Sequence, residues 1–175
     1  MAKWKLDPLH SEVTFKVKHL VISSVSGKFA NIEGSVESEK DDFTDAKIQF
    51  SAEVDSISTG NEQRDGHLKS PDFFDAAHHP KITFVSTQVT QKDKSDYVVK
   101  GELTIRGVTK PVELQAEFGG TQKDFYGNTV AGFELSGKIN RQDYGLQWSA
   151  VTETGGIVVS DDVKIFANVE LHKEA

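Results

Sequence analysis

Residues 99–106, with the sequence VKGELTIR, decide the fold class of this chain. Four small or apolar residues alternate in this stretch with charged or polar ones. Such a two-residue period places the apolar side chains on one face of an extended strand and the polar side chains on the other. The segment at 106–111, RGVTKP, follows directly, and its composition predicts a turn into a second alternating stretch at 112–118. The pattern indicates two neighbouring antiparallel strands, each with one buried face.

The same alternation recurs along nearly the whole chain. Further strand candidates are residues 12–21, 32–37, 46–54, 131–139 and 163–171, with another strand that starts at Ile82. Segments rich in polar residues, Gly and Pro separate these candidates, among them 92–96 and the stretch from Gly119-Gly120 to 128. About eight strands result, mostly antiparallel. Because little helix is available to cover a sheet, the strands must pack as a sandwich or close into a barrel, and closure removes the sheet edges.

Composition limits the architecture and the partners. For 175 residues we expect a single domain, residues 1–175. The absence of cysteine excludes disulfides, thiolate metal sites and cysteine nucleophiles. A net charge of -7 disfavours nucleic acid and anionic membrane surfaces as partners. No apolar run approaches ~18 residues, so we expect no stable membrane insertion. We expect a cytoplasmic location, or a periplasmic or secreted one if a signal peptide has been removed.

Two interpretations of the interior stay open. The inward-facing set contains several phenylalanines together with Gly34, Gly101 and Gly137, which add no side-chain volume. Large residues beside gaps favour a partly hollow core, and a barrel of about eight strands can enclose a small ligand. The simpler interpretation is that the phenylalanines fill the barrel and the glycines mark bends. Alternation along a strand does not measure a cavity.

Residues 60–78 depart from the strand pattern. This insertion contains the charged and aromatic run RDGHLKSPDFFD at 64–75. We expect a short helix here, capped by Ser58 or Thr59, with Phe73 and Phe74 turned inward at one mouth of the barrel.

The polar residues of the insertion have two competing explanations. Arg64, Asp65 and His67 either bond to neighbouring backbone and loops or face the polar head of a ligand at the pocket mouth. An esterase would need an activated serine, but the chain has no G-x-S-x-G motif, and Ser70 lacks the strand-turn-helix setting of a nucleophile. We therefore expect no catalytic residues.

Histidines at four positions invite metal or ligand hypotheses. His78 and His79 are adjacent on an extended segment, so their side chains point apart and make a poor chelate. His10 follows a turn and either satisfies loop hydrogen bonds or touches a ligand. His19 shares the inward parity of its strand, so its ring needs a hydrogen-bond partner from the protein or from a ligand head group. We expect no metal site and no cofactor.

Several ordered motifs resemble those of one known family. They are DPLHS at 7–11 with FKVKHL at 15–20, SGKF at 26–29, STGN at 58–61 with RDGHLKS at 64–70 and DFFD at 72–75, HPKITF at 79–84, GELTIRGVTKP at 101–111, and Gly132-Phe133 with INRQDYG at 139–145. Together they span nearly the whole chain and are similar to the YceI-like family. This resemblance implies an extended, lipocalin-like antiparallel barrel whose elongated pocket holds a polyisoprenoid or a similar long-chain amphiphile.

The resemblance implies a binding function and assigns roles to the inward residues. We expect a non-enzymatic carrier, storage or sequestering protein for a long-chain isoprenoid lipid, such as an isoprenoid quinone or its precursor, and a homodimer is a further expectation. The alternatives are an enzyme acting on a lipid through Arg64, Asp65 and His67, and a filled structural barrel with a stress-related role. The predicted ligand-binding residues are Phe15, Val17, His19, Phe29, Ile48, Phe50, Phe84, Leu103, Ile105, Leu114, Phe118, Phe133, Leu135, Ile139 and Trp148. The predicted pocket mouth or head-group residues are His10, Arg64, Asp65, His67, Phe73 and Phe74.

Overall fold

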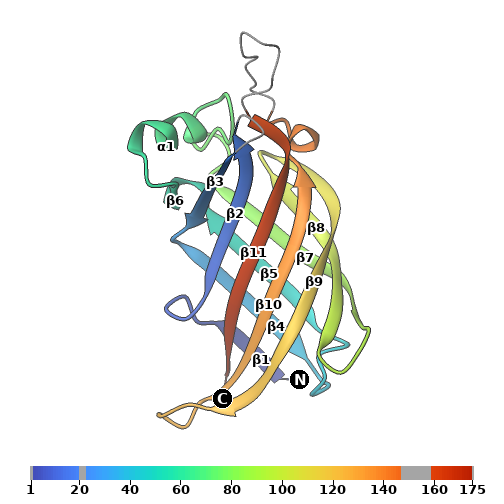
Figure 1. The fold of residues 1–175 in the computed structure, drawn as a ribbon. Helices are drawn as coiled ribbons and strands as arrows, with labels where there is room; N and C mark the ends of the chain where they lie inside the picture. Colours follow the sequence, from blue (N-terminus) through green and yellow to red (C-terminus); the bar gives the residue numbers. More distant parts are fainter. Residues whose placement is uncertain (1, 20–22, 147–158, 175) are drawn as a thin grey trace.

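The computed structural model describes residues 2–19, 23–146 and 159–174, and strands dominate it (Figure 1). The strands are β1 (Ala2–Leu6), β2 (Glu12–His19), β3 (Ser23–Phe29), β4 (Ile32–Ser38), β5 (Lys47–Glu53), β6 (Ile57–Ser58), β7 (Lys81–Gln91), β8 (Asp96–Ile105), β9 (Val108–Lys123), β10 (Thr129–Asn140) and β11 (Val159–Lys173). The helical elements are α1 (Glu62–Lys69) and the short 3-10 helices η1 (Val54–Ser56) and η2 (Arg141–Tyr144). No helix in the described part of the chain is both long and apolar enough to span a membrane.

All strand pairs are antiparallel, and eight strands close into a barrel. Along the described residues the ring runs β1, β4, β5, β7, β8, β9, β10 and β11, and it closes where β11 pairs with β1. The predicted all-β antiparallel barrel is confirmed. In Figure 1 both chain termini lie at one end, called the lower end here, and α1 lies at the other, the upper end.

The membership of the ring differs from the sequence prediction. β1, which closes the ring, was not predicted, because it is five residues long and only Trp4 and Leu6 are buried in it. The first predicted strand is β2, which shares one edge of β11 with β1. Leu171–Lys173 pair with β1, and β2 pairs with the part of β11 nearer the upper end. The serine-rich β3, also not predicted, extends from β2.

The stretch that indicated the fold lies within β8, and its turn is tighter than expected. β8 and β9 are joined by Arg106 and Gly107 alone, whose φ angles are 51° and 74°. Two residues with positive φ form the turn type that matches the twist of an antiparallel hairpin. By contrast, the segment from Gly119-Gly120 to 128, which was predicted to separate two strands, does so only at 124–128. β9 continues to Lys123, and only an irregularity in register opposite Gly132 marks the glycines.

The predicted helical insertion is shorter than residues 60–78, and its cap is a different residue. The helix covers Glu62–Lys69, and the side chain of Asn61 accepts a hydrogen bond from the backbone N–H of Arg64. Ser58 belongs to β6, and Thr59 takes other bonds described below. Asparagine is as good an N-cap as serine. The helix therefore begins two to three residues later than the sequence prediction placed it.

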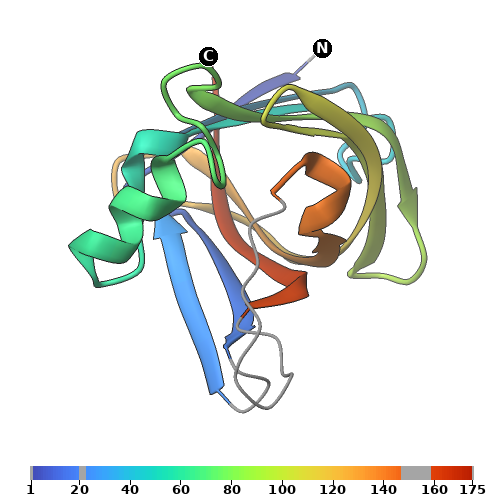
Figure 2. The ribbon, with the colours of Figure 1, turned by 90° about the horizontal axis from the view of Figure 1, so that it is seen from above.

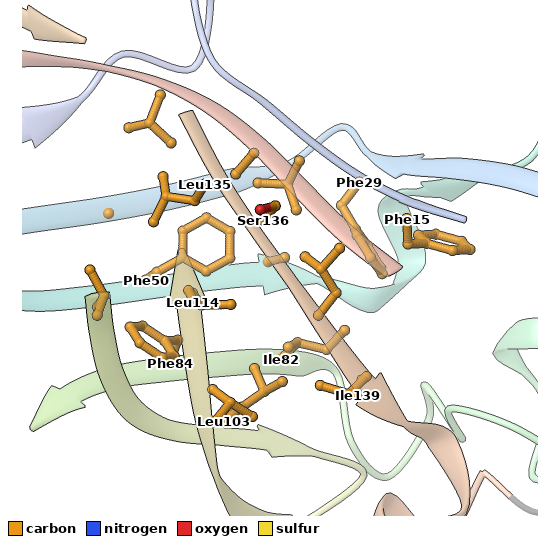
Figure 3. Close-up of a pocket in the computed structure, with 18 of the residues that line it drawn as sticks. Phe15, Phe29, Phe50, Ile82, Phe84, Leu103, Leu114, Leu135, Ser136 and Ile139 are labelled. Carbon is orange, nitrogen blue, oxygen red and sulfur yellow. The ribbon is translucent and has the colours of Figure 1, made fainter. Parts of the chain in front are cut away.

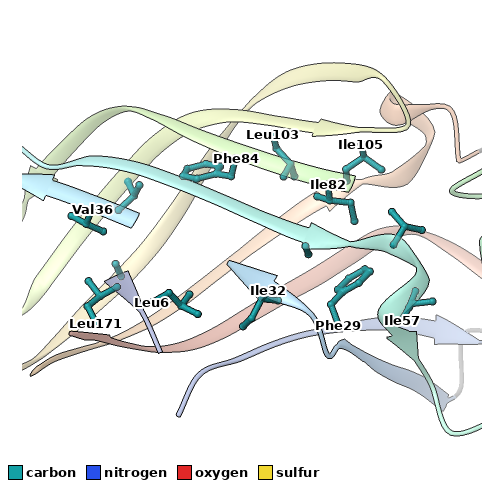
Figure 4. Packing of buried hydrophobic residues seen from close by; sticks show 14 of the residues in the cluster. Leu6, Phe29, Ile32, Val36, Ile57, Ile82, Phe84, Leu103, Ile105 and Leu171 are labelled. Atoms are coloured by element: carbon teal, nitrogen blue, oxygen red, sulfur yellow. The ribbon is translucent and has the colours of Figure 1, made fainter. Parts of the chain in front are cut away.

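The lower end of the barrel is filled by aromatic rings. Phe43 lies between Trp4, Phe118 and Phe133, with ring centroids 5.3, 5.6 and 5.3 Å away. Phe118 and Phe133 stack at 4.8 Å, and the hydroxyl of buried Tyr97 donates to the carbonyl of Asp42 at 2.7 Å. We call these five rings the aromatic plug. Other buried residues pack together along the inner wall, including Ile32, Ile82, Leu103 and Ile105 (Figure 4).

Candidate functional site

An apolar cavity lies inside the barrel and is bordered by the rings of the aromatic plug at Phe43, Tyr97 and Phe133. Phe50, Leu114 and Ile139 are among its other lining residues (Figure 3). The cavity has a volume of about 270 Å³, whereas a single water needs only ~10–15 Å³. Its wall includes inward residues of β11 from Val163 to Leu171, which are roughly 26 Å apart along the strand. Of the two interpretations of the interior, the structure favours the hollow one.

Most of the inward residues expected from alternation do line the cavity. The predicted residues on its wall are Phe15, Val17, Phe29, Ile48, Phe50, Phe84, Leu103, Ile105, Leu114, Phe133, Leu135 and Ile139, with Phe73 and Phe74 from the insertion. Many of them, such as Phe50 and Leu135, are only half-buried although they face inward. Their accessible surface faces the cavity, so it is available to an apolar ligand.

The glycines do not create empty space in the way the sequence suggested. A Cβ at Gly101 would lie 2.5 Å from the ring of Phe84, one at Gly34 3.3 Å from the side chain of Leu6, and one at Gly137 2.5 Å from the side chain of Leu114. In each case a large side chain of the neighbouring strand covers the glycine. The space beside each glycine is therefore taken by a neighbouring side chain.

Phe118 is the predicted ligand residue that the structure places elsewhere. It belongs to the aromatic plug and is absent from the cavity wall, whereas its stacking partner Phe133 belongs to both. The alternation along the strands predicted that Phe118 and Phe133 both point inward. The change in register between Gly132 and Phe133 places Phe133 opposite Phe118, so their rings meet at the lower end. The closed end of the cavity is thus the upper surface of the plug.

The insertion brings apolar side chains to the upper part of the cavity. Leu68 of α1 lies on the wall with Phe73 and Phe74, and Phe74 meets Phe29 edge to face at 6.2 Å. Phe73 is buried. The prediction that both phenylalanines turn inward is therefore confirmed by their positions.

The polar residues of the insertion bond to Thr59 just before it or within it, and they do not line the cavity. Asp65 accepts hydrogen bonds from the backbone N–H and the hydroxyl of Thr59 at 2.9 and 2.6 Å. Arg64 donates to the same hydroxyl at 2.8 Å and to the Thr59 carbonyl at 2.9 Å. The ring of His67 lies 2.9 Å from a carboxylate oxygen of Asp72. Of the two explanations for these residues, the geometry fits the one in which they hold the loops.

Sequence reasoning missed Arg141 as a cavity residue. Arg141 is 3% exposed and lies on the cavity wall at the upper end. Its guanidinium donates to the carbonyls of Leu146 at 2.5 Å and Ser160 at 2.9 Å, and it lies 3.7 Å from Asp161. Burial lowers the pKa of Arg141, and the nearby Asp161 carboxylate opposes this. Arg141 lies two residues after the inward-facing Ile139, which would have indicated an inward position, but an arginine was not expected to point into the barrel.

Arg141 also fixes the segment that crosses the upper end of the barrel. Viewed along the barrel, η2 lies inside the ring of strands (Figure 2). Tyr144 of η2 is 2% exposed, and burial raises its pKa to about 12. Arg106 donates to the carbonyl of Gly145 at 2.7 Å. Two arginines thus hold η2 and Leu146 over the cavity.

His10 lies at the end of the barrel opposite to the insertion. It follows the turn between β1 and β2, and its ring contacts Asp7. His10 therefore does not share a pocket mouth with Arg64, Asp65 and His67, as the sequence prediction assumed. Trp148 and the side chain of His19 lie outside the described part of the chain.

The described wall offers apolar surface and little acid-base chemistry. Among the described residues that line the cavity, none is Asp, Glu, His or Lys, and the charged one is Arg141. Its guanidinium is occupied by backbone carbonyls. Such a wall suits a long apolar molecule held by burial of surface.

Sequence comparison finds relatives that match almost the whole chain. A UPF0312 protein of Staphylococcus epidermidis is 37% identical over 171 residues, covering 97% of both chains. A UPF0312 protein of Staphylococcus aureus is 39% identical over the same length, again covering 97% of both.

Solved structures show the same fold. A mutant YceI protein of Campylobacter jejuni with a monobromobimane guest has a TM-score of 0.78 at 34% identity, covering 90% of each chain. BcnA of Burkholderia cenocepacia has a TM-score of 0.82 at 22% identity, covering 94% of this chain and 98% of that one. A polyisoprenoid binding domain of Saccharophagus degradans has a TM-score of 0.70 at 16% identity, covering 98% of each. The YceI-like domain model matches residues 4–171, so this chain belongs to the YceI-like family.

Proposed function

We propose that this protein binds a long-chain isoprenoid lipid in its barrel cavity and acts as a non-enzymatic carrier, storage or sequestering protein. The observation that carries the proposal is the elongated apolar cavity, whose described wall holds no Asp, Glu, His or Lys. The polyisoprenoid binding domain of Saccharophagus degradans has the same fold, which supports this ligand class. An isoprenoid quinone or its precursor is the cargo that we propose.

Burial of the chain is sufficient for tight binding. Each buried methylene contributes roughly 0.8 kcal/mol. A ligand of about 40 heavy atoms at ~0.3 kcal/mol per atom gains ~12 kcal/mol, which corresponds to a dissociation constant of about 1 nM. No ion pair or metal is required for such affinity. Length and shape of the apolar chain would then set selectivity.

Binding is favoured over catalysis by the positions of the polar residues. Arg64, Asp65 and His67 are the candidates for an active site, and all three make bonds to residues of the insertion or to Thr59. They are absent from the cavity wall. A lipid inside the barrel would therefore meet apolar side chains first.

The first test is native mass spectrometry of the purified protein, followed by organic extraction and mass analysis of the released material. We expect one long-chain isoprenoid per chain, or stoichiometric uptake of an added prenyl lipid. A protein that is empty and takes up no prenyl lipid would contradict the proposal.

A matched pair of variants tests whether the cavity is the site. Phe133 faces the closed end of the cavity, whereas Phe166 of β11 is 41% exposed on the outside of the barrel. Phe133→Trp should shorten the cavity and weaken long prenyl chains more than short ones, and Phe166→Trp should leave both affinities unchanged. Equal loss for long and short chains in Phe133→Trp would refute selection by length.

A further inference from the structure

A cluster of side chains that can bind a metal ion lies on the outside of the barrel at its lower end. Asp7, His10 and Glu170 each offer one donor atom, and these three atoms lie within 4.8 Å of one another. Nδ1 of His10 is 2.6 Å from Oδ2 of Asp7. Nε2 of His172 is 3.1 Å from the same Asp7 oxygen and 3.2 Å from Oε1 of Glu170. Two imidazoles and two carboxylates thus share a small space.

The barrel closure brings these residues together from opposite ends of the chain. β1 pairs with β11 so that Leu6 is opposite Leu171, and the backbone N–H of Asp7 donates to the carbonyl of Glu170 at 2.9 Å. Leu171 is buried toward the cavity. Its neighbours Glu170 and His172 therefore point outward, on one face of the strand. The turn after β1 then places Asp7 and His10 beside them.

We propose that Asp7, His10, Glu170 and His172 form a binding site for a divalent transition-metal ion of the Zn²⁺ type. Imidazole nitrogen and carboxylate oxygen are the donors that Zn²⁺ takes in proteins without cysteine, at 2.0–2.2 Å in a tetrahedron. Donors in such a tetrahedron are separated by roughly 3.3 Å. Three donor separations are 2.6, 3.1 and 3.2 Å, and the donors of Asp7, His10 and Glu170 all lie within 4.8 Å of one another. The proposed ion would therefore sit among Asp7, His10 and Glu170, and rotation of the exposed side chains would bring in His172 as the fourth ligand.

The site is separate from the cavity and was not expected from the sequence. From the sequence, the adjacent His78 and His79 were a candidate pair, and no metal site was expected. Asp7 and His10 are close in sequence, and so are Glu170 and His172. The two pairs come together only because β1 pairs with β11. The ion would tie the turn between β1 and β2 to the end of β11, where the barrel closes.

Protons compete with the metal at this site. The hydrogen bond and charge of Asp7 raise the pKa of His10, and the hydrogen bond to His10 lowers the pKa of Asp7. Glu170, His172 and Asp124 are the other titratable groups whose charges act on this pair. A metal ion needs an unprotonated ring nitrogen of His10, so protonation of that ring competes with the metal and binding should weaken as the pH falls.

The test is titration of the tag-free, chelator-treated full-length protein with Zn²⁺ by isothermal calorimetry, and with Co²⁺ by absorption spectroscopy. We expect one equivalent of Zn²⁺ to bind and Co²⁺ to give the visible bands of a four-coordinate site. His10→Ala and Glu170→Gln should each weaken Zn²⁺ binding at least about tenfold. Circular dichroism checks that each variant is folded, and Asp7→Asn replaces His10→Ala if the alanine variant does not fold.

The chain supplies a matched control. His78 contacts Asp75 at 3.0 Å with the same three-residue spacing as His10 and Asp7, but it belongs to no cluster of three ligands among the described residues. His78→Ala should leave Zn²⁺ affinity and the Co²⁺ spectrum unchanged. Absence of saturable Zn²⁺ binding, or equal losses in His78→Ala and His10→Ala, would overturn the proposal.

Discussion

The lower end of the barrel is packed with aromatic rings, whereas the region above it is hollow, although the strands of both regions have the same alternating pattern. At the lower end Phe43 reaches in from the β4–β5 loop and meets Trp4, Phe118 and Phe133. Higher up, Leu68, Phe73 and Phe74 of the insertion lie on the cavity wall without filling the space, and Phe50 and Leu135 keep accessible surface toward the cavity. Phe43, a loop residue, thus helps to fill the lower end of the barrel, whereas the region above it remains a cavity.

Phe43 itself adopts an unusual backbone conformation. Its φ is 62°, in the left-handed region, which costs a bulky residue on the order of 1 kcal/mol or more. Its side chain is only 3% exposed. Burial of the ring among three aromatic partners offsets the strain.

The largest expected effect comes from emptying the filled end. Phe43→Ala should lower the free energy of unfolding by about 3–5 kcal/mol, because it removes a ring that is 3% exposed and packs against three aromatic partners. Phe50→Ala should cost roughly 1–2 kcal/mol, since its side chain already borders empty space. Denaturant unfolding of the lipid-free proteins measures both values. Equal losses would show that the two regions are packed alike.

The next effect concerns a glycine under a ring on the cavity wall. A Cβ at Gly101 would lie 2.5 Å from both the Phe84 ring and the backbone oxygen of Val85. Backbone cannot move as cheaply as a side chain, so Gly101→Ala should destabilise the protein by about 1–3 kcal/mol. A melting temperature equal to that of the wild type would mean that β7 and β8 can move apart to accommodate the added methyl group.

Gly137→Ala should change the cavity more than the stability. Here the close contact is the end of the Leu114 side chain, at 2.5 Å, and the nearest backbone atom is 3.5 Å away. Leu114 can rotate toward the lumen, which removes space for a ligand. We expect roughly fourfold weaker binding of a long prenyl lipid for each methylene displaced, with little change in the unfolding midpoint. Loss of stability with unchanged lipid affinity would contradict this picture.

The smallest effect lies on the solvated outer rim of the lower end. Asp7 raises the pKa of His10 above its ordinary value, which is about 6.5. The folded state therefore favours the protonated ring, so this stabilisation is present below the ordinary pKa and is lost as the pH rises through the raised one. Asp7→Asn should lower the His10 midpoint in an NMR titration without metal. An unchanged midpoint would show that Asp7 does not hold the proton.

Much of the fold and of the cavity wall was predictable from local pattern. The two-residue period in β8 and β10 gave the strand class and the inward set, and the phenylalanines of the insertion were correctly expected at the barrel interior. Arg141 was missed although its parity pointed inward, because a buried arginine needs backbone carbonyls that only the folded η2 segment and β11 supply.

The sequence by itself determined the antiparallel β class and the face on which each side chain lies, because both follow from the geometry of an extended chain. Tertiary structure decided the rest. Alternation carries no information on the distance across a barrel, so only the closed ring shows a cavity above and a plug below. The meeting of Asp7 and His10 with Glu170 and His172 depends on pairing between the two ends of the chain, and a local pattern cannot encode such long-range pairing.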